Sequence, residues 1–422
     1  MTASIADSIR NNLQHNSETI TAVYQIVTPM FIGDALQEAH GITVNSFKGA
    51  LRFWWRALVW GRIRSSASND AEALKILHEE EALLFGSSAI NPQTEKIYGK
   101  GNVSIKILPQ KFNKKYQNTI HPSLTDYTAA RYLAYGVIEA FSSRPRNVQA
   151  GQLIRDCIDE EQSFTVQISC KNSTSSTILP ALQALGLLGG LGSKNRKGYG
   201  SLALQSLKVG DKNLYSPPES IEKYRQQIST FVVGLPACLP PFSAFSQHTL
   251  IRHLVSGNNC YEVLNAYGTA MLRYRSWGRH GEVLREPSER NFEKDHAWSK
   301  GEDCFTNVAP DLKYEDFHPE RVVFGLPHNY GDQPFQQVGR PVIKNGKTVP
   351  GGRRASPLFF HVHPIGSTFH GIVCLLQATF LPKEEKIQAG LHEVEQAIRW
   401  QVLRECFLCD CRRFLGSTNI FP

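Results

Sequence analysis

The chain has 422 residues, of which 41% are hydrophobic and 20% charged. This composition is typical of globular proteins and excludes a wholly disordered chain, and the length predicts two or three domains. No stretch approaches about 18 consecutive apolar residues and the first residues lack a signal-peptide core, so we expect a cytoplasmic protein that does not interact with membranes. The 46 Lys and Arg residues exceed the 38 Asp and Glu residues. This excess, greater in the first half, favours a polyanionic partner, although ordinary surface solubility explains it equally well.

Periodic patterns predict strands and helices in mixed order in the first half. Alternation of apolar and polar residues predicts strands at 103–108 and 164–169, and further strands are expected at 21–28 and 201–209. Helical spacing predicts helices at 47–60, 71–84, 126–141 and 177–188, the first with Ser46 as its N-cap. Because short alternating strands are half-buried, we expect an α+β fold with antiparallel sheets that carry helices on one face.

A turn-rich segment at 210–220 indicates a domain boundary, which predicts domains at 1–215 and 216–422. The second half begins with an extended segment at 231–235, a helix at 260–277 and a charged insertion of little periodicity at about 278–320. Beyond it we expect extended segments at 321–326, 358–362 and 369–380, a hairpin at 342–349 that turns at Asn345-Gly346, and a last helix at 386–414.

A row of cations follows one side of the predicted 47–60 helix. Lys48, Arg52 and Arg56 stand four residues apart, so the helix places them in line. An apolar stripe occupies another side and contains Phe47, Leu51, Trp54, Trp55 and Leu58, so the two tryptophans are expected in the core. Like charges in a row repel one another, which favours an anion such as phosphate. A solvated helix face with acidic partners elsewhere is the alternative.

The segment 189–200 contains five glycines and the cations Lys194, Arg196 and Lys197. Glycines allow backbone N–H groups to approach an anion closely. The segment is neither a P-loop nor a dinucleotide-binding turn, because it follows a helix and precedes a strand. A phosphate-binding loop is the first interpretation, and a flexible basic connection is the second.

This glycine-rich basic loop after an apolar helix resembles that of the RAMP superfamily of CRISPR–Cas proteins. Three further segments are similar to those of the first-numbered subunit family of type III-B Cmr effector complexes: 28–33 (TPMFIG), 47–58 (FKGALRFWWRAL) and 353–358 (RRASPL). The resemblance implies two tandem ferredoxin-like (RRM-like) domains. It also implies a non-catalytic RNA-binding subunit that contacts the 3′ region of the CRISPR RNA, helps to capture complementary target RNA in antiviral defence, and assembles with other Cmr-type subunits.

In such a complex, base pairing between guide and target RNA carries the sequence specificity. Contacts from the protein to the RNA backbone therefore suffice for binding. The expected RNA contacts are Lys48, Arg52, Arg56, Ser193, Lys194, Asn195, Arg196, Lys197, Arg353 and Arg354. Tyr199 is a candidate for stacking on bases, and Arg273, Arg275 and Arg279 beside a helix end are further candidates for RNA contact.

Two other functions remain open at this point. A RAMP endoribonuclease that processes precursor CRISPR RNA would need a histidine or an isolated acid, for which His40, His121 and Asp34 are the candidates. A mainly structural subunit would present its basic faces to acidic protein partners. Cys406, Cys409 and Cys411 form half of a metal-binding pattern that only the fold could complete with His361, His363, His370 and Cys374, so we expect neither a metal nor another cofactor.

Overall fold

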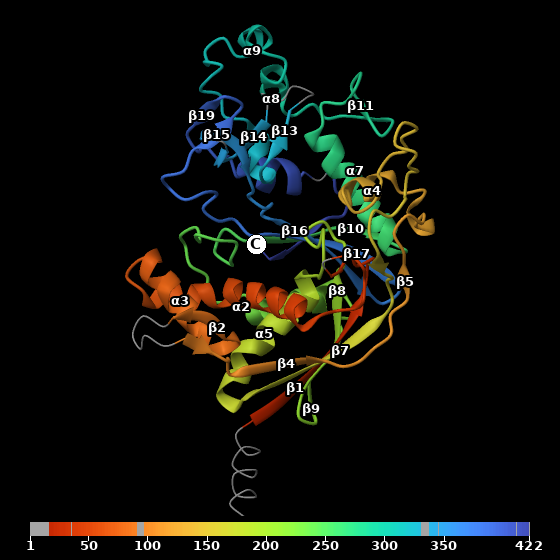
Figure 1. Ribbon diagram of the computed structural model, residues 1–422, viewed down its shortest axis with the longest axis vertical. Helices are drawn as coiled ribbons and strands as arrows, with labels where there is room; N and C mark the ends of the chain where they lie inside the picture. Colours follow the sequence, from red (N-terminus) through yellow and green to blue (C-terminus); the bar gives the residue numbers. More distant parts are fainter. Residues whose placement is uncertain are drawn as a thin grey trace, which may run out of the picture.

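The computed structural model describes residues 17–34, 36–90, 97–330, 337–344, 346–410 and 412–421. Most of the first half of the chain forms the lower part of the molecule and most of the second half the upper part, while α4 (Thr128–Leu133) of the first half lies beside α7 (Cys260–Arg275) of the second (Figure 1). Both parts combine antiparallel sheets with helices, as expected from the sequence. None of the helices in the described part has the length and apolar character needed to cross a membrane.

The first sheet is antiparallel and has the strand order β4-β7-β1-β8-β9. Its strands are β1 (Ser17–Ile26), β4 (Val103–Ile107), β7 (Ser163–Lys171), β8 (Leu202–Val209) and β9 (Lys212–Tyr215). In the central strand β1, the alternating residues Ile20, Ala22, Tyr24 and Ile26 are fully buried. The helices α2 (Val44–Ser66) and α5 (Asn172–Leu188) lie together over the sheet (Figure 1). This alternating burial marks the helix-covered face of the sheet, and β1 begins and ends before the predicted bounds of 21–28.

Helix α2 begins two residues earlier than the predicted N-cap. Thr43, rather than Ser46, is the N-cap, and its side chain accepts a hydrogen bond from the Ser46 N–H. The apolar stripe of the helix is buried as predicted, with Trp54 and Trp55 each 2% exposed. Helix α3 (Asp70–Phe85) packs against α2 and ends at Gly86, and the short pair β2 (Ser87–Ile90) and β3 (Ile97–Gly99) follows.

The second sheet is antiparallel with the order β16-β17-β10-β20. Its strands are β10 (Leu250–Gly257), β16 (Leu358–Ile365), β17 (Thr368–Leu375) and β20 (Thr418–Phe421). Phe360 points toward α7 (Cys260–Arg275), where it stacks on Tyr267 with 3.8 Å between ring centres. The neighbouring Phe359 faces the other way and contacts Trp54 of α2. This sheet is therefore buried on both faces, which explains why β16 reads as an apolar run without alternation.

Residues between α7 and β16, together with residues 387–394 beyond the second sheet's strand β17, form a folded lobe at the top of the molecule (Figure 1). It contains a sheet of β13 (His328–Asn329), β14 (Gln337–Lys344), β15 (Lys347–Gly352), β18 (Ile387–Ala389) and β19 (His392–Val394), with α8 (Glu293–Trp298), α9 (Glu302–Val308) and the pair β11 (Glu282–Val283) and β12 (Glu286–Pro287). Trp298, Phe305 and Phe317 belong to its own apolar core. The insertion at 278–320 thus contains more regular structure than its sequence suggested.

Several predicted elements are wrong. The segment 321–326 lies mostly in the 3₁₀-helix η2 (Glu320–Phe324), and 386–414 contains β18, β19 and a π-helix, η3 (Val402–Leu408), instead of one helix. Only Thr128–Leu133 of 126–141 is helical, as α4, and the helix α6 (Ile221–Phe231) occupies residues without a predicted helix. The hairpin at 342–349 is confirmed by the pairing of Lys344 with Lys347, whereas Asn345 lies outside the described residues. The remaining elements are β5 (Lys114–Lys115), β6 (Cys157–Ile158) and the 3₁₀-helix η1 (Pro122–Leu124).

Candidate nucleic-acid interface

The glycine-rich segment 189–200 lies where the two halves of the chain meet. It connects α5 to β8 of the first sheet, and the Ser193 N–H donates to the Phe31 carbonyl oxygen at 2.7 Å. From the second sheet, the Phe360 N–H donates to the Arg196 carbonyl oxygen at 3.2 Å, and Lys197 bridges to the same strand. The segment is therefore held by backbone hydrogen bonds from both halves.

Two glycines of this segment are required by close packing. Gly200 has a φ of +65°, and a Cβ there would overlap the Leu191 carbonyl oxygen. Gly192 has a φ of +80°, and its Cβ would overlap the Phe31 carbonyl oxygen. Lys194 also adopts the left-handed region, with a φ of +65°. The loop is therefore tightly packed and holds a non-glycine residue in the left-handed backbone region. This argues against the second interpretation of the sequence, a flexible basic connection.

Cations from several segments surround the loop. We call the group formed by Lys194, Arg196 and Lys197 of the loop with Arg155, Arg275, Arg353 and Arg354 the central cation cluster. Arg155 precedes β6, Arg275 ends α7, and the last two lie between β15 and β16. The predicted loop cations and the predicted pair Arg353 and Arg354 are thus brought together, although they stand far apart in the sequence.

Burial and mutual repulsion destabilise the charged forms of the cluster. Burial, with the charges of Arg275, Lys194 and Arg196, lowers the pKa of Lys197 to about 7. Burial, with the charge of Arg354, lowers the pKa of Arg196 to about 10. The pKa of Lys194 is also lowered, by burial and then by Arg353 and Arg155. An anion placed among these groups would relieve the repulsion.

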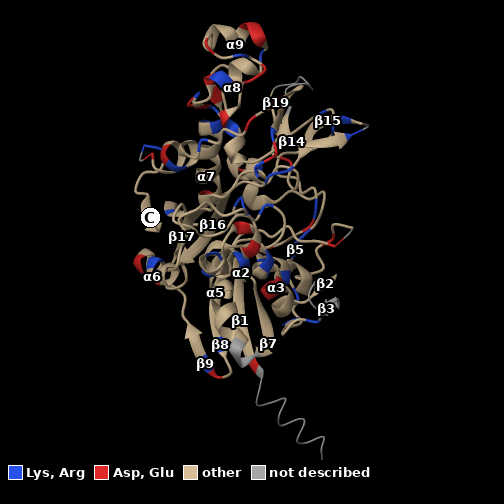
Figure 2. Cartoon of the chain, turned by 90° about the vertical axis from the view of Figure 1, so that its left-hand side faces the viewer, with Lys and Arg blue, Asp and Glu red and all other residues tan. Residues whose placement is uncertain are grey.

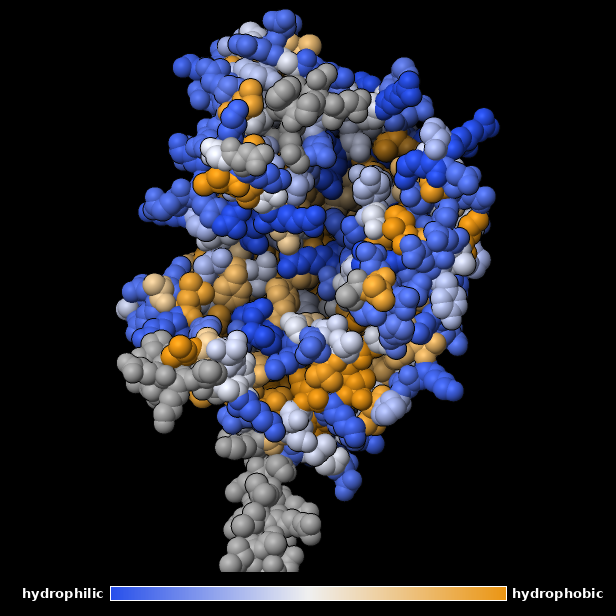
Figure 3. Space-filling view, in the orientation of Figure 1, coloured by the Kyte–Doolittle hydropathy of each residue, from blue (hydrophilic) through white to orange (hydrophobic). Residues whose placement is uncertain are grey.

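No carboxylate of the described residues forms an ion pair with any side chain of the central cation cluster. Acidic residues are instead prominent around α9, at the end of the molecule furthest from the first sheet (Figure 2). In Figure 3, hydrophilic residues gather around a hollow midway along the molecule. The cluster therefore carries positive charge that the described part of the fold does not neutralise.

Two pockets adjoin the cluster. One, of about 420 Å³, is lined by Arg275 and Arg321 together with Tyr132, Tyr135 and His328. The other, of about 370 Å³, is lined by Asn195, Arg196, the backbone of 188–192 and the aromatic residues Phe53 and Trp54. Pockets that combine cations with aromatic rings match the chemistry of a nucleotide, which has a charged backbone and a flat base.

The predicted row on α2 is engaged within the fold. Arg52 Nε and Arg56 Nη1 contact the same oxygen of Glu81 on α3, at 2.5 and 2.7 Å, and Lys48 Nζ donates to the Phe85 carbonyl oxygen. Glu81 is only 7% exposed. The row therefore ties α2 to α3, and Glu81 is an acidic partner of the kind that the alternative interpretation of the row required.

The polar residues of the loop also have partners. Ser193 Oγ accepts a hydrogen bond from Arg155 Nη1 at 3.1 Å, and Asn195 Nδ2 donates to the Gly190 carbonyl oxygen at 3.2 Å. Asn195 is nevertheless exposed. The expectation that Tyr199 stacks on bases is wrong, because its side chain is fully buried and its hydroxyl donates to the Ala130 carbonyl oxygen. Arg155 was missed because no local pattern links it to the loop.

The histidines of the second sheet pair with one another. His361 Nδ1 contacts the Gly189 carbonyl oxygen at 2.9 Å and its Nε2 contacts His363 Nδ1 at 3.1 Å. Burial lowers the pKa of His361 to about 3, so its ring is neutral. His40, a candidate for catalysis, is exposed and lies 3.3 Å from Asp34.

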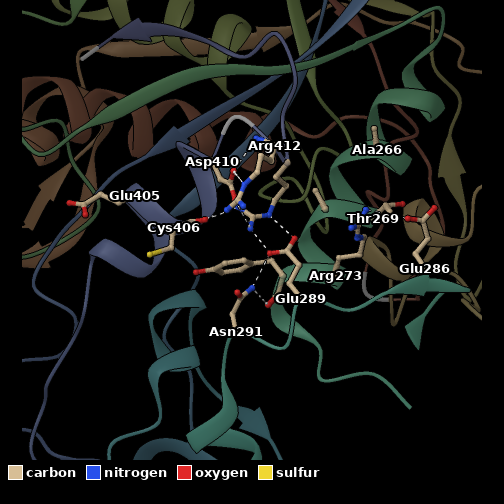
Figure 4. A pocket seen from close by; sticks show the side chains of 13 residues that line it. Ala266, Thr269, Arg273, Glu286, Glu289, Asn291, Glu405, Cys406, Asp410 and Arg412 are labelled. Atoms are coloured by element: carbon tan, nitrogen blue, oxygen red, sulfur yellow. Dashed lines mark hydrogen bonds and ion pairs between the residues drawn. The ribbon is translucent and has the colours of Figure 1, made fainter. Parts of the chain in front are cut away.

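Another pocket, of about 960 Å³, lies between α7 and the C-terminal segment. Glu289 and Asp410 turn toward its centre in Figure 4, where each pairs with the Arg413 guanidinium. Its charges therefore compensate one another, unlike those of the central cation cluster. Cys406 lies at its edge, Cys409 Sγ accepts from Arg252 Nη1 at 3.5 Å, and Cys411 lies outside the described residues.

Comparisons with known proteins bear on the whole chain. Residues 23–203 match the sequence model of the RAMP superfamily. Cmr1 from Pyrococcus furiosus, in its apo form, is 17% identical, with 96% of this chain and 98% of that chain covered and a TM-score of 0.53. A chain of the type III-B Cmr-beta complex bound to cognate target RNA is 12% identical, with 93% and 98% covered and a TM-score of 0.51. Among curated proteins, no sequence matches this chain. The resemblance predicted from the motifs is thus confirmed: residues 23–203 match the RAMP superfamily, and the chain as a whole has a fold similar to that of Cmr1.

Proposed function

We propose that this chain is a non-catalytic RNA-binding subunit of a type III-B CRISPR effector complex. The observation that carries the proposal is the central cation cluster, whose side chains have no carboxylate partner among the described residues. A phosphate backbone supplies the missing negative charge, and neutralising several phosphates gives most of the affinity for RNA without reading its sequence.

The comparisons support the same assignment. One of the similar structures is a chain of a complex bound to target RNA. We infer that this chain contacts the 3′ region of the CRISPR RNA, helps to capture target RNA, and works beside other Cmr-type subunits in the cytoplasm. Base pairing selects the target in such a complex, so contacts from the protein to backbone and shape suffice.

We also infer two ferredoxin-like modules in tandem, with a boundary near residue 215. Numbered within each module, the four strands lie in the spatial order 2-3-1-4 in both sheets. This order is β4-β7-β1-β8 in the first sheet and β16-β17-β10-β20 in the second. In both, a helix follows the first strand. Strand β9 ends at Tyr215 and α6 begins at Ile221, which supports division into 1–215 and 216–422.

The proposal is tested by single-stranded RNA binding of the full chain at several salt concentrations. The variant Lys194→Ala with Arg353→Ala removes one cation from each half without removing an ion pair. Each lost phosphate contact lowers the log–log salt slope by about 0.7, so we expect a slope about 1.4 smaller and an affinity at least about tenfold weaker.

The matched control is Lys208→Ala with Lys212→Ala, which removes two exposed lysines from the edge of the first sheet. This control should bind RNA as the unchanged chain does. Equal losses in both double variants would mean that net charge, and not the cluster, governs binding. Incubation of repeat-containing RNA with the chain in chelator should yield no cleavage product, and a product would identify an endoribonuclease instead.

A further inference from the structure

A second group of chemically reactive side chains lies away from the central cation cluster. His121, Cys157 and Asp159 meet beside the small β5–β6 sheet, in the segment between β4 and β7. Cys157 and Asp159 are two residues apart in extended chain, so their side chains point the same way. Ile158 between them points oppositely, into the core of the first sheet. His121 precedes η1, where its N–H donates to the Gly151 carbonyl oxygen at 3.0 Å.

The donor atoms of these three residues converge. One ring nitrogen of His121, the Cys157 sulfur and one carboxylate oxygen of Asp159 all lie within 4.8 Å of one another. Imidazole, thiolate and carboxylate are the three ligand types that proteins use to bind zinc. The same residues come from two segments of the chain, so a bound ion would join them.

The ring of His121 makes an edge-to-face contact with Tyr261, with 5.7 Å between ring centres, but it forms no polar contact within the described residues. This side chain is fully buried, and neither ring nitrogen has a hydrogen-bond partner. A neutral imidazole offers one donor and one acceptor, and buried groups of this kind normally have partners. Asp159 Oδ1 is also buried and unpartnered, while its Oδ2 accepts from Lys115 Nζ at 2.7 Å. The unsatisfied atoms are those that a metal ion would bind.

The electrostatic setting agrees with this arrangement. Burial and the charge of Lys115 lower the pKa of His121 to about 4, so the ring is neutral, the form that binds metals. Burial keeps the Cys157 thiol protonated in the metal-free chain, and a metal would displace that proton. Thiolate and carboxylate together would offset the two charges of a divalent ion, and Lys115, which pairs with Asp159, adds one positive charge beside the site.

We propose that His121, Cys157 and Asp159 form a structural zinc site. The fourth tetrahedral position is open to water. The neighbouring Glu160 has a buried Oε2 without a partner, and its Oε1 accepts from Tyr261 Oη at 2.5 Å. Since Tyr261 lies in the first turn of α7, this hydrogen bond connects the segment that would hold the ion to the second half. This site is separate from the proposed RNA contacts and does not depend on them.

Cobalt titration of the full chain tests the site. After removal of metals with a chelator, we expect one equivalent of Co²⁺ to bind with a thiolate-to-metal charge-transfer band, which Zn²⁺ then abolishes by displacement. Cys157→Ser should eliminate the band. Asp159→Asn keeps the thiol and the side-chain shape, and should weaken Zn²⁺ binding at least about tenfold, measured by competition with a chromophoric chelator.

Two controls separate this site from other possible ligands. Cys374→Ser removes a buried thiol elsewhere, and Cys406→Ser with Cys409→Ser removes two exposed ones; both variants should keep the band. Cobalt at the exposed group Asp34, Glu38 and His40 gives no thiolate band, because that group has no sulfur. A band that survives in a folded Cys157→Ser chain, or no thiolate band in the unchanged chain, overturns the proposal. If circular dichroism shows that Cys157→Ser is unfolded, the Asp159→Asn affinity decides, and an unchanged affinity likewise overturns it.

Discussion

The guanidinium carbon of Arg196 lies 4.3 Å from the ring centre of Phe359, and Arg196 Nη1 donates a 2.6 Å hydrogen bond to the Ser356 carbonyl oxygen. Arg196 thus joins the loop of the first half to the sheet of the second while it contributes charge to the central cation cluster. We expect Arg196→Ala to lower the free energy of unfolding by about 1–3 kcal/mol, since it removes both contacts. Urea denaturation measures this.

Arg196→Lys is the informative companion variant. It preserves the charge but loses the planar group that both stacks and donates, so it should recover little of the lost stability. If Arg196→Ala is as stable as the unchanged chain, the two contacts of Arg196 contribute nothing to the packing of the two halves against each other.

The second prediction concerns Glu81, whose buried carboxylate compensates the positive charges of both Arg52 and Arg56. Glu81→Gln should lower the free energy of unfolding by about 1–3 kcal/mol, since two cations lose their partner. The exposed pair of Arg62 and Glu80 gives the control, and Glu80→Gln should cost less than about 1 kcal/mol.

The same variant tests the sequence-based prediction that the row of Lys48, Arg52 and Arg56 contacts RNA. We expect the RNA affinity of Glu81→Gln to remain unchanged, because these side chains face α3. A rise of about tenfold or more would mean that Glu81 restrains a row that does contact phosphate.

The lowered pKa of Lys197 leads us to expect that the affinity for RNA depends on pH. This pKa is lowered from 10.5 to about 7, first by burial and then by Arg275, Lys194 and Arg196. A nearby phosphate favours the ammonium form, so RNA binding raises the pKa and takes up a proton. Affinity should therefore fall as the pH rises above about 7, by at most about tenfold per pH unit. Fluorescence anisotropy with labelled RNA measures it.

Lys197→Met is the control for that dependence, since it keeps an unbranched apolar chain without the titrating group. It should bind RNA with a flatter pH profile. In the RNA-free chain, the unfolded state holds a proton that the folded state lacks between about pH 7 and 10.5. Stability should consequently rise with pH across that window in the unchanged chain, and Lys197→Met should lose this contribution. Identical RNA-binding profiles for both chains would contradict the position assigned to Lys197.

We expect a large loss of stability when a single methyl group is added at Gly200. Its φ is +65° and an added Cβ would overlap the Leu191 carbonyl oxygen, so Gly200→Ala should cost several kcal/mol. Gly210 also has a positive φ, +55°, but nothing lies within 4 Å of the position of its Cβ. Gly210→Ala should therefore cost only about 1 kcal/mol. Thermal denaturation of the two variants side by side compares them, and equal losses would argue against close packing of the loop.

Local patterns predicted those elements whose burial follows one period. The alternation of Val103, Ile105 and Ile107 marks β4, and the spacing of Phe47 and Leu51 marks α2. The region 386–414 misled the prediction because its apolar spacing suited a helix, whereas pairing of β18 with β14 makes part of it extended. Such pairing depends on residues about fifty positions away, which no local window contains.

The candidate site was predictable only in part, for the same reason. The density of glycines and cations at 189–200 is visible in the sequence. The position of Arg155 beside it depends on the folding of the first half, and that of Arg275 on the packing of the two halves. The acid that faces Arg52 lies on the neighbouring helix, and the donors beside Cys157 include a histidine 36 positions earlier. The spacing of residues along one helix shows which side chains share a face of that helix. It does not show which residues of other elements pack against that face.

The two-sided burial of β16 limits how this chain can be divided. Phe359, Ile365 and Ile372 face the core shared with the first half, so a fragment that began at residue 216 would expose an apolar sheet surface to water. Such a fragment would tend to aggregate, and the first half would lose the layer that covers Trp54. Despite two similar sheets, thermal melting should thus show a single cooperative transition for both halves.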